Sequence, residues 1–196
     1  MTMLALLIAA FVCPPSQRVP ADWKPEAPAS CDKLQGTDVF DANLTGEGDK
    51  LIQARYRCGQ KRALRIAVLV PLPDAGLCRL DGEDLSIDLA AGEKRLLDFV
   101  ELTRAGRKVV KVRDQSEGSA SVAFFEAQGW SLKKIFFSQT LETLATAHGP
   151  LAARWTIELG PELPRTIRAQ RCVEGAPCDD PEEWQYAKAG GKYVKK

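Results

Sequence analysis

An oxygen-rich loop near the start of the chain carries the side chains best suited to chemistry. Its oxygen donors are Asp41, Asn43, Thr45, Asp49 and the backbone carbonyl of Glu47. Calcium takes several oxygen ligands in a flexible cage, and Gly46 permits the sharp bend of a coiled loop, so the loop is a candidate calcium site. Two alternatives use the same residues. One is a polar turn in which Asp41 and Asn43 cap the backbone, and the other is a glycosylation sequon at Asn43-Leu44-Thr45 in a eukaryotic secretory host.

Residues suited to catalysis are sparse. His148 is the single histidine of the chain, which excludes a multi-histidine metal site, and no Gly-x-Ser-x-Gly elbow accompanies it. Carboxylates come close in sequence at Asp98 and Glu101 and again at 179–180. A hydrolase acting on polysaccharide would need two of them about 5–9.5 Å apart, and nothing in the sequence fixes that separation. We therefore expect a protein without catalytic residues, with the carboxylate-pair hydrolase as the alternative.

Basic residues gather in two clusters. They are Arg104, Arg107, Lys108, Lys111 and Arg113 in one, and Lys188, Lys192, Lys195 and Lys196 in the other. A solvated strand face and a charged tail explain both clusters; the alternative is a patch that contacts anionic lipid or an envelope polymer. The formal charge of the 196-residue chain is only +1, which argues against a dedicated nucleic-acid-binding protein.

The N-terminus is typical of an exported protein. An uncharged apolar stretch, Met3–Val12, has the length of a signal-peptide core, and no apolar run approaches the ~20 residues of a membrane-spanning helix. We expect a signal peptide over 1–21, cleaved after Ala21, or lipidation at Cys13. Five prolines between positions 14 and 28 then predict a proline-rich tether over 22–36.

The cysteines favour an oxidising compartment. Six are present and none forms a Cys-x-x-Cys pair, which removes support for a zinc ribbon. Cys172 and Cys178 flank a short loop with Gly and Pro at its tip, where a disulfide is plausible. A second disulfide is expected between Cys58 and Cys78, which leaves Cys31 as a thiol or as a partner for Cys13.

A sequence pattern recurs about every 58 residues. Residues 44–52, 102–110 and 159–167 resemble one another, and each is followed by alternating apolar and polar residues. The apolar positions Ile52, Val110 and Ile167 stand at the same place in the three copies. Alternation with period two is the signature of a strand with one buried face.

Each copy continues as a β-meander. Further strands are expected at 64–70 and 77–80, at 122–126 and 130–137, and at 183–186 and 192–194, with glycine turns between them. The sequence thus predicts a mainly β fold of three consecutive antiparallel meander units, about 37–94, 95–152 and 153–196, in a single domain over 37–196. The connector 138–148 fits either a short helix or a strand. The aromatic residues Trp130, Trp155, Trp184 and Tyr186 are expected to pack in the core or between units.

Residues 41–49 match the pattern D-x-[DN]-x-[DST]-G-x-x-D. This loop resembles the calcium loop of FG-GAP or VCBS repeats, the blades of integrin-type β-propellers. The resemblance implies propeller-blade-like units over about 37–196 and a calcium ion at the first loop. The second and third loops lack the acidic ligands, and three units are too few to close a propeller.

Together these features predict an exported, non-catalytic β-repeat protein, periplasmic, envelope-anchored or extracellular. Its role would be binding or scaffolding, with a protein or an envelope polymer as partner, through loops at one rim of the sheets. The alternatives are the hydrolase above and a secreted inhibitor or immunity protein.

Overall fold

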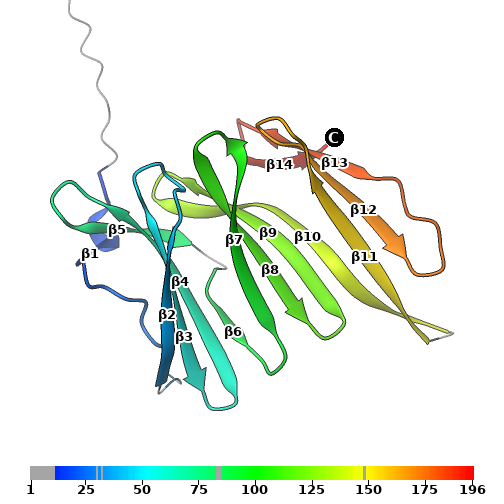
Figure 1. Ribbon diagram of the computed structural model, residues 1–196, viewed down its shortest axis with the longest axis horizontal. Helices are drawn as coiled ribbons and strands as arrows, with labels where there is room; N and C mark the ends of the chain where they lie inside the picture. Colours follow the sequence, from blue (N-terminus) through cyan, green and yellow to red (C-terminus); the bar gives the residue numbers. More distant parts are fainter. Residues whose placement is uncertain (1–11, 30, 32, 83–84, 148) are drawn as a thin grey trace, which may run out of the picture.

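The chain folds almost entirely into β-strands (Figure 1). The computed structural model describes residues 12–29, 31, 33–82, 85–147 and 149–196. Strands account for 63% of the described residues and helical residues for 2%, so the predicted mainly β fold is confirmed. The helical part described is one 3-10 turn, η1 (Pro15–Gln17). The connector that fitted either helix or strand is strand as far as Thr146.

No helix in the described part of the chain has the length and apolar character needed to cross a membrane.

The first sheet is built from the N-terminal half of the chain. Its strands are β1 (Arg18–Val19), β2 (Lys33–Asp41), β3 (Lys50–Cys58), β4 (Lys61–Pro71), β5 (Leu77–Gly82) and β6 (Ile87–Leu89). Along one edge, β4 pairs with the whole of β3 through its residues 61–69. Along its other edge it pairs with β6 at residues 62–64 and with β5 at residues 68–71. The sheet therefore splits beside residues 65–67.

The second sheet is a continuous antiparallel meander. Its strands are β7 (Lys94–Arg104), β8 (Arg107–Ser116), β9 (Ser119–Gln128), β10 (Ser131–Thr146), β11 (Gly149–Leu159), β12 (Ile167–Val173), β13 (Glu182–Ala187) and β14 (Lys192–Lys195). β10 pairs with β9 and, near its end, with β11. A short parallel pairing of β10 with β5, at Ser131 and Leu132, joins the two sheets.

The predicted three meander units are present, as β2–β5, β7–β10 and β11–β14, and they follow one another along the long axis of the molecule (Figure 1). The second strand of each unit begins just after the repeated loop. There Val110 and Ile167 are fully buried and Ile52 is 9% exposed. Two residues further on, Ala54, Val112 and Ala169 are buried as well. The apolar positions that recur in the sequence are thus the positions that are buried in the structure.

The middle unit is covered on both faces. On β9, Ala123 and Phe125 face a core between the two sheets, whereas Val122 and Phe124 face a second core under the C-terminal unit. We call them the inter-sheet core and the C-terminal core. The C-terminal core is rich in rings: Phe136 lies 5.6 Å from Trp184 and 6.1 Å from Tyr193, between ring centroids. Trp184 and Tyr186 pack against this core, and Trp130 packs against the inter-sheet core.

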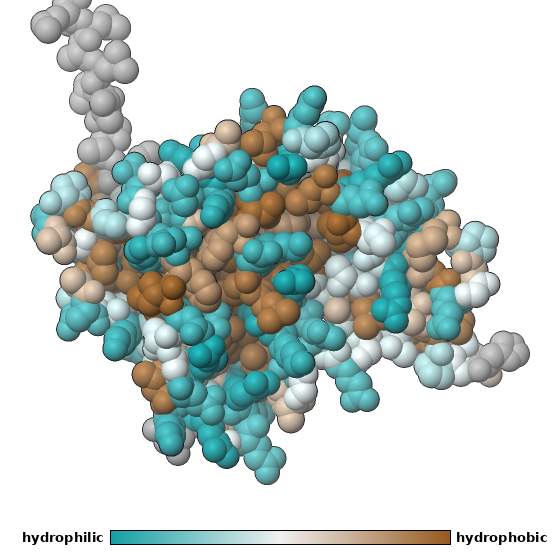
Figure 2. Space-filling model, in the orientation of Figure 1, coloured by the Kyte–Doolittle hydropathy of each residue, from teal (hydrophilic) through white to brown (hydrophobic). Residues whose placement is uncertain are grey.

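The two sheets also meet at the surface. Phe40 of β2 lies 6.2 Å from Phe99 of β7, between ring centroids. Figure 2 shows apolar surface along the middle of this face, with hydrophilic side chains on either side. The inter-sheet core therefore reaches the solvent here rather than being sealed by a loop.

The proline-rich segment lies on the first sheet instead of forming a tether. We call residues 13–31 the N-terminal strap. Cys13 is joined to Cys78 at its start, and Cys31 is joined to Cys58 at its end. Between them, β1 pairs with β5, and the Tyr56 hydroxyl donates a hydrogen bond of 2.5 Å to the Pro25 carbonyl. The expected apolar core of a signal peptide lies outside the described residues except for Val12.

The disulfides correct the expected pairing of Cys58 with Cys78 and the expected lipidation at Cys13. Cys58 and Cys78 are not joined, because Cys58 lies beside Lys61 and Cys78 beside Val70. Nine residues of strand separate these positions, about 30 Å, and a disulfide requires Cα atoms within about 7 Å. The bond to Cys78 also occupies the Cys13 sulfur, which leaves no thiol for a lipid, and cleavage after Ala21 would remove half of that disulfide. At the other end of the chain, Cys172 is joined to Cys178.

The strap disulfide at Cys13 should stabilise the fold more than the disulfide at Cys172. The first closes a sequence separation of 65 residues and the second a separation of 6, and the entropy removed from the unfolded chain grows with loop length. Replacing Cys13 and Cys78 by Ala should lower the free energy of unfolding by about 4 kcal/mol, against about 2 kcal/mol for Cys172 and Cys178. Urea unfolding of the two double variants measures the difference, and an equal or reversed order would contradict it.

Candidate functional site

The loop expected to bind calcium is closed by its own hydrogen bonds. Asp49 is 1% exposed. Its carboxylate accepts hydrogen bonds from the Leu44 N–H at 2.7 Å, the Thr45 N–H at 3.1 Å and the Thr45 hydroxyl at 2.8 Å. An aspartate that caps its own turn in this way is the polar-turn alternative. Two of the expected ligands, Thr45 and Asp49, do lie together.

The other expected ligands point elsewhere. Asp41 forms an exposed ion pair with Lys50, and its hydrogen bond with this lysine lowers the pKa of the Asp41 carboxyl. The Asn43 side chain donates a hydrogen bond of 2.9 Å to the Gly106 carbonyl. In the described part of the chain no three His, Cys, Asp or Glu side chains gather as metal ligands would. Asp41 and Asn43 thus contact partners outside the turn that Thr45 and Asp49 form, and the calcium site at these residues and the Glu47 carbonyl stays a prediction from the sequence.

The repeated loops instead bind one another at a single rim. Besides the Asn43 side-chain bond to the second loop, the Asn43 carbonyl accepts from the Lys108 N–H at 3.0 Å. From the third loop, the Arg165 N–H donates to the Leu102 carbonyl at 2.8 Å and its Nε donates to the Glu101 carbonyl at 2.9 Å. Loops from all three units therefore meet beside the β7–β8 turn of the middle unit.

A buried carboxylate lies below this rim. Glu126 is 3% exposed and accepts hydrogen bonds from the Thr103 hydroxyl, the Tyr186 hydroxyl at 2.6 Å and the Gln128 amide at 3.1 Å. Arg104 lies 3.7 Å away. Burial, and then the hydrogen bond to Glu126, raise the pKa of Tyr186 to about 12. Sequence reasoning missed Glu126, although a glutamate that ends the apolar run Val122–Phe125 was a usable signal.

Above Glu126 the turns enclose a cavity of about 610 Å³, which we call the rim pocket. It is lined by the first repeated loop, the β7–β8 and β9–β10 turns and the β13–β14 turn. Three of its lining residues are cationic: Arg104, Arg107 and Lys188. Arg107 and Lys188 form no ion pair with the described residues, and Glu47 is the one carboxylate of the described lining.

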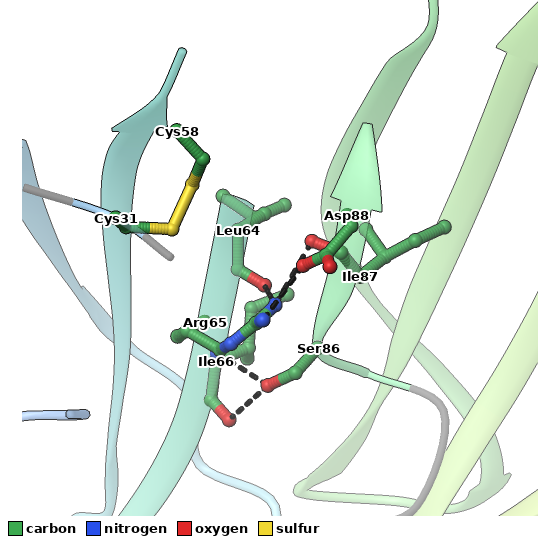
Figure 3. Close-up of polar contacts among 8 residues, drawn as sticks. All are labelled: Cys31, Cys58, Leu64, Arg65, Ile66, Ser86, Ile87 and Asp88. Atoms are coloured by element: carbon green, nitrogen blue, oxygen red, sulfur yellow. Dashed lines mark hydrogen bonds and ion pairs between the residues drawn. A yellow bond between two sulfur atoms is a disulfide. The ribbon is translucent and has the colours of Figure 1, made fainter. Parts of the chain in front are cut away.

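A second cavity, of about 1020 Å³, lies where the first sheet splits. We call it the cleft. Ser86 occupies the gap in the β-ladder: its hydroxyl accepts from the Ile66 N–H at 3.0 Å and donates to the Ile66 carbonyl at 3.5 Å (Figure 3). Arg65 reaches from β4 to β6, where it contacts Asp88 at 2.6 Å and the Ile87 carbonyl at 3.1 Å. These contacts fix Ser86 and β6 to β4 beside the cleft.

The cleft is cationic and has an aromatic wall. The N-terminal strap supplies Trp23, and the Arg79 guanidinium lies 5.6 Å from its ring centroid, a cation–π distance. Lys133 and Lys134, at the start of β10, line the opposite side and are exposed. Glu26 is the one carboxylate among the described lining residues. Among the described lining residues the cationic side chains thus outnumber the carboxylates.

The remaining candidate residues are dispersed. The carboxylates of Asp98 and Glu101 accept hydrogen bonds from the Phe99 and Gly106 N–H groups, at 2.8 and 3.2 Å. In the C-terminal basic cluster, Lys195 pairs with Glu182 and Lys196 with Glu183. Lys111 and Arg113 line a smaller groove between β8 and β11. His148 lies outside the described residues.

Comparison with known proteins identifies no relative. No protein family matches the chain, and no curated protein or solved structure is similar to it. The resemblance to FG-GAP or VCBS repeats therefore stays a prediction from the loop sequence.

The Ser86 hydroxyl should contribute measurably to stability. Ser86→Ala leaves the Ile66 N–H and carbonyl without their partner in the ladder gap, which should lower the free energy of unfolding by about 1 kcal/mol. Ser131→Ala, in the same cleft, is the matched control and should change it little. Urea unfolding of both variants tests this, and equal effects would show that Ser86 does not complete the ladder.

Stability should fall at alkaline pH through Tyr186. Its pKa rises from 10.0 in the unfolded chain to about 12 in the fold, so its contribution is complete below pH 10 and is lost as the pH rises through 12. Tyr186→Phe should flatten this decline in the urea midpoint, whereas Tyr56→Phe, which retains Tyr186, should keep the wild-type slope. Identical slopes for wild type and Tyr186→Phe would contradict the assignment.

Proposed function

We propose that this chain is an exported, non-catalytic binding protein of the cell envelope or extracellular space, and that the cleft binds an anionic ligand. The observation that carries the proposal is the excess of cationic over acidic side chains among the described residues that line the cleft. Arg79, Lys133 and Lys134 line it together with Trp23 and Glu26. A concave surface that carries mostly one sign of charge concentrates ligands of the opposite sign.

The build of the cleft supports binding rather than turnover. Its walls are fixed by the β-ladder, by the Ser86 hydrogen bonds and by the strap disulfides, and a preformed site loses little entropy on binding. The cleft presents cationic side chains and the Trp23 ring, which suit recognition of an acidic sugar or another anionic group that carries an apolar face.

Export is supported separately, by the disulfides. Three disulfides fit an oxidising environment. They tie the segment that follows the apolar N-terminal stretch to the folded domain, so export would deliver an oxidised, preformed cleft.

A short acidic oligosaccharide should bind the cleft. The probe is trigalacturonate, with neutral maltotriose for comparison, measured by titration calorimetry. The double variant Lys133→Glu, Lys134→Glu should weaken trigalacturonate binding by roughly tenfold, because it reverses two partly solvated charges. The double variant Arg57→Glu, Lys61→Glu makes the same charge change beside the β3–β4 turn, away from the cleft. It should bind as the wild type does.

Three results would overturn the proposal. Equal binding of the neutral trisaccharide would remove the role of charge. Equal weakening by the control variant would show a general electrostatic effect rather than a site. Release of new reducing ends from the acidic sugar would identify the hydrolase alternative.

A further inference from the structure

All three meander units supply walls of the rim pocket, and hydrogen bonds fix these walls to one another. Asn43 of the first repeated loop donates to the Gly106 carbonyl of the β7–β8 turn at 2.9 Å. At the end of β9, the Gln128 amide donates to the Gly191 carbonyl of the β13–β14 turn at 2.6 Å. A Cβ atom at residue 191 would lie only 2.5 Å from the Gln128 Nε2, so glycine permits this close approach. The pocket is therefore preformed, which reduces the entropy lost on binding.

Three cationic side chains line the rim pocket, and two of them have no acidic partner. Arg107 and Lys188 are exposed and form no ion pair within the part of the chain that the structure describes. Arg104 has the Glu126 carboxylate at 3.7 Å, but that carboxylate is buried and already accepts hydrogen bonds from three other groups. The exposed Glu47 is the one carboxylate among the described lining residues. The pocket thus keeps an excess of positive charge, and guanidinium groups bind a carboxylate or a phosphate through paired hydrogen bonds.

Apolar side chains line the same pocket. Val70 belongs to the inter-sheet core, and Ala127 and Trp130 pack against that core. The Tyr186 ring packs against the C-terminal core, while its hydroxyl donates to Glu126. Both cores therefore reach the rim at this pocket. An apolar and aromatic lining with a few charged groups is typical of a small-molecule site, and the volume of about 610 Å³ lies in the usual range of such sites.

From these observations we infer that the rim pocket binds a small amphipathic anion: a carboxylate or phosphate group carried by a flat apolar body. The charged group pairs with the free cations Arg107 and Lys188, and the apolar body covers the aromatic and aliphatic lining, which a bare inorganic ion would leave in water. The inference does not depend on the proposed function, because the cleft and the rim pocket share none of their described lining residues.

Titration calorimetry with 1-naphthoate and 1-naphthyl phosphate tests the inference, and comparison of these two probes identifies the preferred head group. Neutral 1-naphthamide supplies the body without the charge, whereas acetate and inorganic phosphate supply the charge without the body. At least one of the two naphthyl anions should bind roughly tenfold or more tightly than each of these three controls.

Two matched variants locate the site. Arg107→Gln with Lys188→Gln should weaken binding of the naphthyl anion by roughly tenfold. The urea midpoint should stay unchanged, because neither side chain has an ion pair to lose among the described residues. Lys133→Gln with Lys134→Gln removes two charges from the cleft instead, and should leave binding of the naphthyl anion as in the wild type.

The outcomes that would overturn the inference are distinct from those that bear on the cleft. Absence of binding by both naphthyl anions, equal binding of 1-naphthamide, or wild-type affinity in the rim-pocket variant would each show that the rim pocket is not an anion site. Weakening by the cleft variant alone would place the naphthyl anion in the cleft. Failure of trigalacturonate to bind would refute the proposed function and leave the rim pocket untouched.

Discussion

The fold depends on a strand that is buried on both faces. Successive residues of β9, from Val122 to Phe125, face the inter-sheet core and the C-terminal core in turn. Neither face of such a strand can be left in water without exposing an apolar surface, so the middle unit needs the first unit on one side and the third on the other. Glu126 ends this run, and its burial is tolerated because three hydrogen-bond donors surround its carboxylate.

Stacking the units around β9 also decides where the rim pocket lies. The repeated loops come to one rim and bond to each other through Asn43 and Arg165, so the rim pocket is a product of packing between units. The cleft has another origin, because β4 changes partner from β6 to β5 and the sheet opens between them. Both hollows have lining residues near the start of β10, the strand that joins the two sheets.

The N-terminal strap links the stability of the fold to the geometry of the cleft. It adds Trp23 to the cleft and is fixed at both ends by disulfides to the first sheet. Proline fixes φ and removes a hydrogen-bond donor, so a proline-rich segment cannot add a regular strand to the sheet. It forms only the two-residue β1, and covalent bonds at Cys13 and Cys31 hold the remainder in place.

The sequence by itself determined the class of fold and the three meander units, because alternation with period two and turn glycines are local properties, and Ile52, Val110 and Ile167 are buried at equivalent places. Only the tertiary structure decided the rest. Whether Asp49 binds an ion or caps its own turn depends on neighbouring loops, and which cysteine meets Cys78 depends on strand register. The cationic cleft joins Trp23, Arg79 and Lys133, which are remote in sequence and meet only where the sheet splits. Such proximity has no local signature, since it arises from packing between units rather than from any one segment.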